Sequence, residues 1–158
     1  MYNRPMLIAL GADHAGFELK EALKPLLDAR AVRWHDFGTS STTSVDYPDY
    51  AVAVAEAVAG GTADRGILVC GSGVGMAIAA NKVPGIRAAS ILDSDEGRLA
   101  REHNDINVLA LGARRTTPFE AEAILDVFLA TAFGGGRHLQ RVQKIQQIET
   151  RSHHGDAS

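Results

Sequence analysis

The sequence lacks several features that would define whole classes of protein. A single cysteine among 158 residues cannot form an internal disulfide, which is typical of a reducing compartment. The apolar stretches are brief, and the first of them, 6–10, is too short for a signal peptide or a membrane span. We therefore expect a cytoplasmic protein that does not associate with membranes.

An excess of charge of one sign is also missing. Lys and Arg total 16 and Asp and Glu total 19, and the net charge of −3 does not provide the basic field of a nucleic-acid-binding protein. The content of 46% hydrophobic and 22% charged residues is that of an ordinary globular domain. We expect one domain over residues 1–150, with a core that needs no disulfide or metal, and a disordered polar tail at 151–158.

Glycine, in contrast, is abundant. The chain has 16 glycines, roughly a tenth of its residues, where the average usage is about 7%. They are clustered and not periodic, which excludes a collagen-like sequence and indicates tight turns or ligand-binding loops.

Short apolar runs alternate with stretches of helical spacing. Runs typical of strands buried on both faces lie at 6–10, 67–70, 86–92 and 108–111, with a weaker one at 32–37. This alternation predicts a Rossmann-like α/β fold, a doubly wound parallel sheet of five strands with helices on both faces. A last helix at 138–149 has an apolar stripe and no strand after it, so we expect it to pack on the flank of the domain or on a partner chain.

Unusual polar residues follow the predicted strands, at the edge where open parallel sheets bind ligands. Asp13 and His14 follow the first strand and Arg114 follows the fifth. The third strand leads into Cys70-Gly71-Ser72-Gly73-Val74-Gly75, where alternate glycines would expose backbone N–H groups to an anion. A thiol at the start of such a loop can act as a base or a nucleophile, and the alternative is a buried cysteine that packs as a small apolar residue.

Several other motifs are excluded or left open. The loop lacks the G-x-G-x-x-G spacing and has no following Lys-Ser/Thr pair, so it is not a nucleotide-binding loop of either kind. A Cys-dependent phosphatase needs an arginine at the position of Met76. Arg137 and Arg141, one helical turn apart, can converge on a phosphate or form a solvated face. The histidines do not have metal-ligand spacing, and we expect no metal site.

In combination these motifs are specific. The chain resembles type B ribose-5-phosphate isomerases, a family shared with galactose-6-phosphate isomerase subunits, from about residue 6 to residue 149. The motifs that carry the resemblance are 11–17 (GADHAGF), 46–48 (DYP), 70–75 (CGSGVG), 80–82 (ANK), 85–88 (GIRA), 103–105 (HND) and 135–138 (GGRH).

The resemblance implies an activity and a mechanism. Family members interconvert ribose 5-phosphate and ribulose 5-phosphate in the pentose phosphate pathway, without a metal or organic cofactor. Cys70 matches the base that moves a proton between C1 and C2 through a cis-enediolate. Some members have serine there and use a glutamate further along, but the corresponding position here, Asn81 or Met76, holds no base. His103 matches the residue that opens the furanose ring.

The resemblance also implies the remaining contacts of a sugar phosphate. Asp13 is expected to bind the sugar hydroxyls, and Ser72 is expected to assist in proton handling. The backbone N–H groups of 71–75 are expected to stabilise the enediolate oxygen. Asn104 is expected near the reacting carbons. The substrate-binding residues that we expect are His14, Tyr47, Gly71, Ser72, Gly73, Val74, Gly75, Asn104, Arg114, Arg137, His138 and Arg141.

Family members are dimers or larger, with sites built from two chains. We therefore expect a homodimer or homotetramer with shared active sites, in which the two helical arginines serve their own site or the neighbour's. Three alternatives remain open: an allose-6-phosphate or galactose-6-phosphate isomerase of the same family, a Cys-dependent phosphatase, and a non-catalytic sugar-phosphate sensor.

Overall fold

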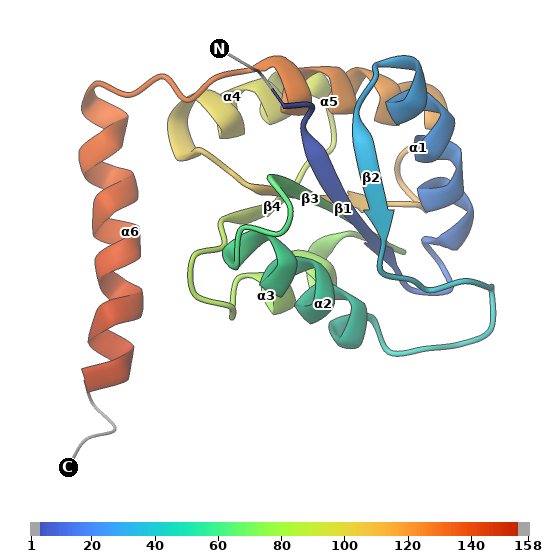
Figure 1. Cartoon of the computed structure of the whole chain (residues 1–158), viewed down its shortest axis with the longest axis horizontal. Coiled ribbons are helices and arrows are strands. Elements are labelled where there is room, and N and C mark those ends of the chain that lie inside the picture. Colours follow the sequence, from blue (N-terminus) through green and yellow to red (C-terminus); the bar gives the residue numbers. More distant parts are fainter. Residues whose placement is uncertain (1–3, 155–158) are drawn as a thin grey trace.

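The computed structural model describes residues 4–154, and the side chains of residues 4–151. Strands and helices alternate along the chain until the last two helices follow each other (Figure 1). The elements are β1 Leu7–Ala12, α1 Phe17–Ala29, β2 Arg33–Asp36, α2 Tyr47–Ala59, β3 Arg65–Cys70, α3 Val74–Ala80, β4 Ala88–Ser90, α4 Ser94–Asn104, β5 Val108–Gly112, α5 Pro118–Ala130 and α6 Arg137–His154.

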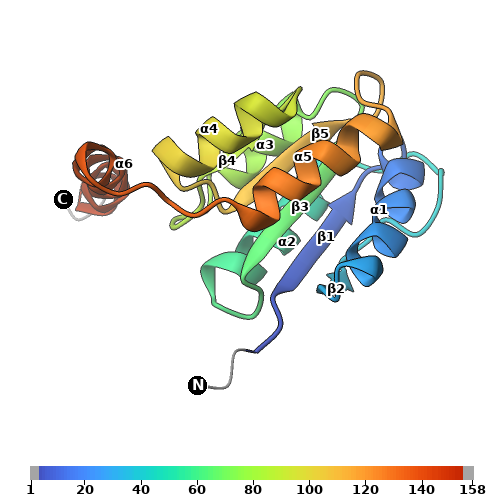
Figure 2. The same ribbon diagram turned by 90° about the horizontal axis from the view of Figure 1, so that it is seen from above.

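The five strands form one parallel sheet in the order β2-β1-β3-β5-β4. Helices α1, α4 and α5 cover one face and α2 and α3 cover the other (Figures 1 and 2). The predicted Rossmann-like α/β fold is therefore confirmed. The chain proceeds from β1 to one side and then returns to β3 on the other, which creates a switch point where ligands bind in folds of this class.

Side chains alternate between two apolar cores because successive residues of a strand point to opposite faces of the sheet. In β1, Ile8 and Leu10 pack with α1 and α5 in one core, and Ala9 packs with α2 in the other. Gly11 has space only for hydrogen, since a Cβ there would lie 2.8 Å from a methyl group of Val54. Small residues thus bring α2 close to the sheet near the carboxyl end of β1.

Several predicted boundaries shift by one or two residues, and two elements differ clearly in length. The apolar run 86–92 predicted a longer strand, but the strand is only Ala88–Ser90, and directly before it the Arg87 N–H bonds the side chain of Asn107 at 2.8 Å. Helix α6 continues through His154, so residues 151–154 of the predicted tail are helical. Residues 155–158 lie outside the described residues, and the disorder of that part stays a prediction.

Helix α6 packs on the flank of the domain and stands apart from the sheet layers (Figure 2). It follows Gly134–Gly136, where Gly135 and Gly136 have φ values of +63° and +55° that favour glycine. Val142 is buried against the domain, and the Glu149 carboxylate accepts a hydrogen bond from the Gly85 N–H at 3.0 Å. The helix is therefore attached to the domain at two points along its length.

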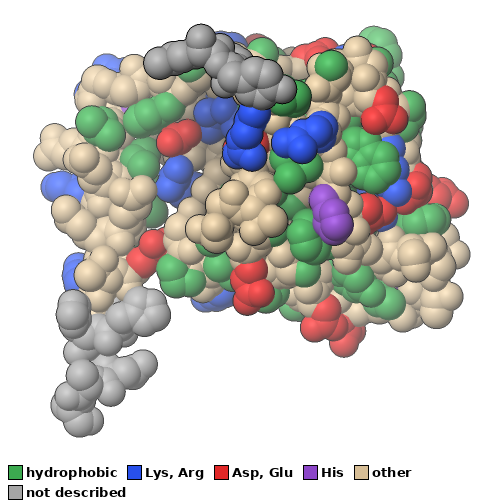
Figure 3. All heavy atoms as spheres, in the orientation of Figure 1, with side chains coloured by type: hydrophobic (Ala, Val, Ile, Leu, Met, Phe, Trp, Pro, Cys, Tyr) green, Lys and Arg blue, Asp and Glu red, His purple; other side chains and the backbone are tan. Residues whose placement is uncertain are grey.

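Acidic and basic side chains are interspersed over the visible face of the molecule (Figure 3). Several arginines on the body of the protein are neutralised locally, for example Arg30 by Glu122 and Asp126. Across the described residues, none of the helices combines the length and the hydropathy needed to cross a bilayer.

Candidate active site

The first group of predicted site residues follows β1. Asp13 is buried, and its Oδ1 accepts a hydrogen bond from the Gly16 N–H at 3.0 Å, which fixes the turn that leads into α1. Gly16 itself lies against β3, where a Cβ would be only 2.2 Å from the carbonyl oxygen of Val69. This close approach places Asp13 and the adjacent His14 beside the end of β3.

Cys70 is the last residue of β3 and is 4% exposed. Its Sγ accepts a hydrogen bond from the backbone N–H of Gly73 at 3.1 Å. Gly73 has a φ of +81°, a left-handed conformation that L side chains rarely adopt, and it precedes the first residue of α3. The glycine loop is therefore folded around the thiol.

Two backbone N–H groups of the loop donate within the loop itself. The Gly73 N–H bonds the sulfur, and the Val74 N–H bonds the Ser72 hydroxyl at 3.2 Å. These two N–H groups are thus engaged inside the loop. Stabilisation of a substrate oxygen by the N–H groups of 71–75 stays a prediction.

Two further glycines make room for functional side chains. A Cβ at Gly71 would lie 3.1 Å from Cζ of Arg114, whose guanidinium reaches over the loop from the end of β5. A Cβ at Gly75 would lie 2.7 Å from the ring of Tyr47, the first residue of α2. Glycine at both positions lets a cation and a phenol flank the thiol.

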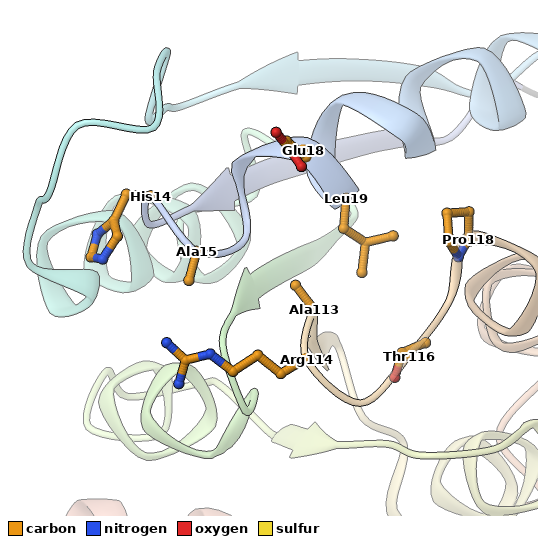
Figure 4. Close-up of a pocket in the computed structure, with 8 residues that line it drawn as sticks. All are labelled: His14, Ala15, Glu18, Leu19, Ala113, Arg114, Thr116 and Pro118. Carbon is orange, nitrogen blue, oxygen red and sulfur yellow. The ribbon is translucent and has the colours of Figure 1, made fainter.

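These residues surround one open cavity of about 520 Å³, a size that suits small-molecule binding. It is lined by Asp13, His14, Ala15, Tyr47, Cys70, Gly71, Ser72, Val74, Gly75, Ile78 and Arg114. A second cleft of about 530 Å³ adjoins it and shares His14, Ala15 and Arg114 (Figure 4). The His14 ring and the Arg114 guanidinium lie toward the same end of this cleft, and Leu19 and Pro118 lie toward the other.

The second group of predicted residues lies elsewhere in this chain, where α4 ends and α6 begins. The rings of His103 and His138 stack with centroids 4.2 Å apart and an interplanar angle of 16°. Loss of hydration and then the nearby charge of His103 lower the pKa of His138 from its usual value, and Arg137 and Arg141 add to the effect. The structure therefore joins His103, His138 and the two arginines into one cationic cluster.

This cluster is not brought together with Cys70. None of its members lines the cavity around Cys70 or the cleft beside it, and Asn104 faces a groove between α6 and the domain with Ile145. The predicted site is thus divided into two halves: the thiol half, made of Asp13, His14, Tyr47, Arg114 and 70–75, and the histidine–arginine half, made of His103, Asn104, Arg137, His138 and Arg141.

The structure also locates the two positions considered for an alternative base. Met76 is fully buried in the core, and the Asn81 side chain pairs with the backbone of Ala88 through its amide nitrogen at 2.9 Å and its oxygen at 2.8 Å. Neither side chain can take a proton from a substrate. In the described part of the chain, no three His, Cys, Asp or Glu side chains are grouped as metal ligands.

One contact at the site was missed by the sequence. The backbone N–H of Val45 donates a hydrogen bond to Nδ1 of His14 at 3.1 Å. A backbone donor from a loop 31 residues away in the sequence has no signature in residue types, so no motif could have revealed it.

The fold and the thiol half define an α/β protein of the doubly wound class with a small-molecule site at the sheet's switch point. Residues 8–145 match the model of the Ribose/Galactose Isomerase family. The chain belongs to this family, and the expected resemblance is confirmed.

Its relatives are similar over nearly their whole length. Ribose-5-phosphate isomerase B of Escherichia coli (strain K12) is 50% identical over 144 residues, which cover 91% of this chain and 97% of that protein. The structure of Clostridium thermocellum ribose-5-phosphate isomerase B is 50% identical and has a TM-score of 0.92, covering 93% of this chain and 99% of that one. The structure of Mycoplasma genitalium ribose-5-phosphate isomerase B with bound ribulose-5-phosphate is 39% identical with a TM-score of 0.89, covering 94% and 99%.

Proposed function

We propose that this protein is an aldose–ketose isomerase that interconverts D-ribose 5-phosphate and D-ribulose 5-phosphate. The observation that carries the proposal is the thiol half, in which Cys70 lies at a cavity beside Arg114 and His14. Membership of the family and the names of its closely similar relatives support the same substrate.

Cys70 acts as the base in this proposal. Its thiolate takes the proton from C2 of the open-chain aldose, and the C–H electron pair forms the C1–C2 double bond of a cis-enediolate while the π pair of the C1 carbonyl moves to O1. The thiol then returns the proton to C1 as the C2 carbonyl forms. Ser72 moves the hydroxyl proton between O2 and O1, so that the carbonyl passes from C1 to C2. Asp13 binds the sugar hydroxyls. For the proton transfer between C2 and C1, a base whose pKa is close to the working pH is the most effective.

The histidine–arginine half completes the site from a second copy of the chain. His103 opens the furanose ring, Asn104 binds near the reacting carbons, and Arg137, His138 and Arg141 bind the phosphate together with His14 and Arg114. This arrangement requires a homodimer, or a homotetramer built from such dimers. It is supported by the separation of the two halves within one chain, since each half lacks groups that the other contains.

The test is a direct assay of ribose 5-phosphate conversion to ribulose 5-phosphate by the purified protein with a chelator present. We expect turnover that is independent of added metal, and loss of turnover by about 10²–10⁴-fold in Cys70→Ala with retained binding of ribose 5-phosphate. Full activity of Cys70→Ala would remove Cys70 from the mechanism, and a strict requirement for metal would contradict the proposed chemistry.

A comparison of substrates separates the alternatives within the family. A coupled assay with ribose 5-phosphate, allose 6-phosphate and galactose 6-phosphate should give the highest kcat/KM for the pentose. Turnover of p-nitrophenyl phosphate would instead indicate a phosphatase, which the buried Met76 argues against. Binding of ribose 5-phosphate without any turnover would indicate a sensor.

A further inference from the structure

His14 is held from behind by the loop that connects β2 to α2. The Val45 N–H of this loop donates to Nδ1 of His14 at 3.1 Å. A backbone N–H can only donate, so Nδ1 must be the unprotonated, accepting nitrogen of the imidazole. The neutral ring then carries its proton on Nε2.

The start of this loop is tied to β1. The Ala12 N–H donates to the Gly38 carbonyl at 2.7 Å, and the Thr39 N–H donates to the Ala12 carbonyl at 2.8 Å. Both bonds lie directly before Asp13 and His14 in the chain. The loop and the residues that it supports therefore share a rigid attachment.

An ion-pair cluster under the loop strengthens this attachment. Asp36 accepts from the Gly38 N–H at 2.8 Å, and its other oxygen binds Nζ of Lys20 at 2.5 Å and Nζ of Lys24 at 2.8 Å. Burial alone would raise the pKa of Asp36, but the two lysines and the Gly38 N–H together lower it. Lys20 is fully buried, which makes this cluster part of the domain and not a mobile surface contact.

The Nε2 side of His14 is free to meet a ligand. The structure gives Nε2 no hydrogen-bond partner within residues 4–151, and His14 lines both the cavity around Cys70 and the adjoining cleft. Arg114 lies at the same end of that cleft (Figure 4). A proton on Nε2 would therefore be available beside a guanidinium, where an anionic oxygen is favoured.

We propose that the Val45 backbone N–H is a positioning group that holds His14 as the neutral Nε2–H tautomer, so that His14 donates one directed hydrogen bond to the substrate phosphate. The role of the phosphate rests on the proposed function; the tautomer itself does not. His14 then orients the phosphate through this hydrogen bond, and the arginines supply the positive charge of the phosphate site. Val45 acts only through His14 and is not a catalytic residue.

The tautomer is tested by NMR on protein labelled with ¹⁵N in histidine. At about pH 8, above the ordinary histidine pKa of about 6.5, two-bond ¹H–¹⁵N correlations distinguish Nε2–H from Nδ1–H rings. The His14 signal is assigned by its loss in His14→Gln. We expect the Nε2–H pattern in the wild type and in Val45→Ala, which keeps the N–H, and an added Nδ1–H population in Val45→Pro, which lacks it.

Inorganic phosphate is the probe for the proposed hydrogen bond from His14 to the phosphate group. Its addition should shift the His14 Nε2–H signal in the wild type. An Nδ1–H pattern for His14 in the wild-type protein would overturn the proposal whether or not the protein isomerises sugars. Loss of isomerase activity with the Nε2–H pattern intact would instead count against the proposed function alone.

A pair of substitutions at His14 tests the donor even if Val45→Pro fails to fold. The amide nitrogen of Gln reaches the position of Nε2 and can donate. The Asn oxygen reaches the position of Nδ1 and accepts from Val45, but the shorter side chain places no donor at the position of Nε2. We expect His14→Asn to raise KM about tenfold or more, in line with the loss of a hydrogen bond to a charged group. His14→Gln should raise KM several-fold less than His14→Asn does. Equal KM values for the two variants would contradict a donor at Nε2.

Discussion

At the scale of single residues, the glycine loop shows how one residue type serves several purposes. Gly71 and Gly75 are needed for space, because Arg114 and Tyr47 occupy the volume of a Cβ. Gly73 is needed for conformation as well, with its φ of +81°. Cys70 therefore owes its hydrogen-bonded position to the backbone of the loop and not to a neighbouring side chain.

Gly73→Ala should destabilise the protein and reduce kcat. A non-glycine residue in the left-handed region costs about 1–2 kcal/mol, and the new Cβ would also lie 3.0 Å from the backbone carbon of Leu111. Gly61→Ala is a matched control, because Gly61 has a φ of +80° but nothing within 4 Å of a Cβ. Urea unfolding should show the larger loss in Gly73→Ala, and only this variant should lose turnover; equal losses would mean that the loop has room to adjust.

Arg141→Ala is expected to raise KM for ribose 5-phosphate. A hydrogen bond to a charged group contributes roughly 1.5–3 kcal/mol, so an increase of about tenfold or more is expected. Lys144→Ala, on the same exposed helix and one turn further, should leave KM within about twofold because it removes only a solvated charge. Steady-state kinetics of both variants test this, and an unchanged KM in Arg141→Ala would make the arginine pair a solvated face.

At the scale of elements, the sequence predicted the kind of each element better than its ends. The apolar run at 86–92 predicted a strand buried on both faces, but only Ile86 and Ile91 are buried and Leu92 is 40% exposed. The Asn107 side chain accepts from the Arg87 N–H at 2.8 Å, and the ladder is confined to Ala88–Ser90. The order of the strands could not be obtained from periodicity, because the insertion of β5 between β3 and β4 depends on long-range packing.

The stacked histidines predict a pH dependence for the attachment of α6. Because the pKa of His138 is lowered in the folded protein, the unfolded chain binds more protons as the pH falls through the ordinary histidine range around 6.5. The stabilisation is therefore present above this range and is lost below it. Urea unfolding at about pH 7.5 and 5.5 should show a larger fall in the free energy of unfolding for the wild type than for His138→Gln; an equal fall in both would contradict a role of His138.

At the scale of the whole molecule, the division of the site is the main result that residue spacing did not provide. The two halves consist of residues predicted from the sequence, but the sequence does not show which of them meet within one chain, and it did not predict Ala15 and Ile78 in the lining of the cavity around Cys70. The structure separates Cys70 from His103 because the first ends β3 and the second ends α4, beside α6. Resemblance to the family supplied the expectation of shared sites, and the geometry gives a physical reason for it.

Shared sites predict complementation between two inactive variants. In a twofold-symmetric dimer, a chain with Cys70→Ala and a chain with His103→Ala form one doubly damaged site and one intact site. Random mixing of the two chains after denaturation and refolding should therefore restore about a quarter of the wild-type activity. Each variant refolded alone is the control. No recovery in the mixture, with mixed dimers confirmed by mass spectrometry, would place a complete site within each chain.

The strand order also has a consequence for synthesis of the chain. Among the strands of residues 4–154, β4 pairs only with β5, which lies between it and the rest of the sheet. A growing chain that has reached residue 90 can thus contain the three-stranded sheet β2-β1-β3 with the Cys70 loop, while β4 has no ladder partner until residues 108–112 are made. Most of the thiol half is therefore synthesised before Arg114, and the groups on α6 that complete the proposed site for a neighbour come last.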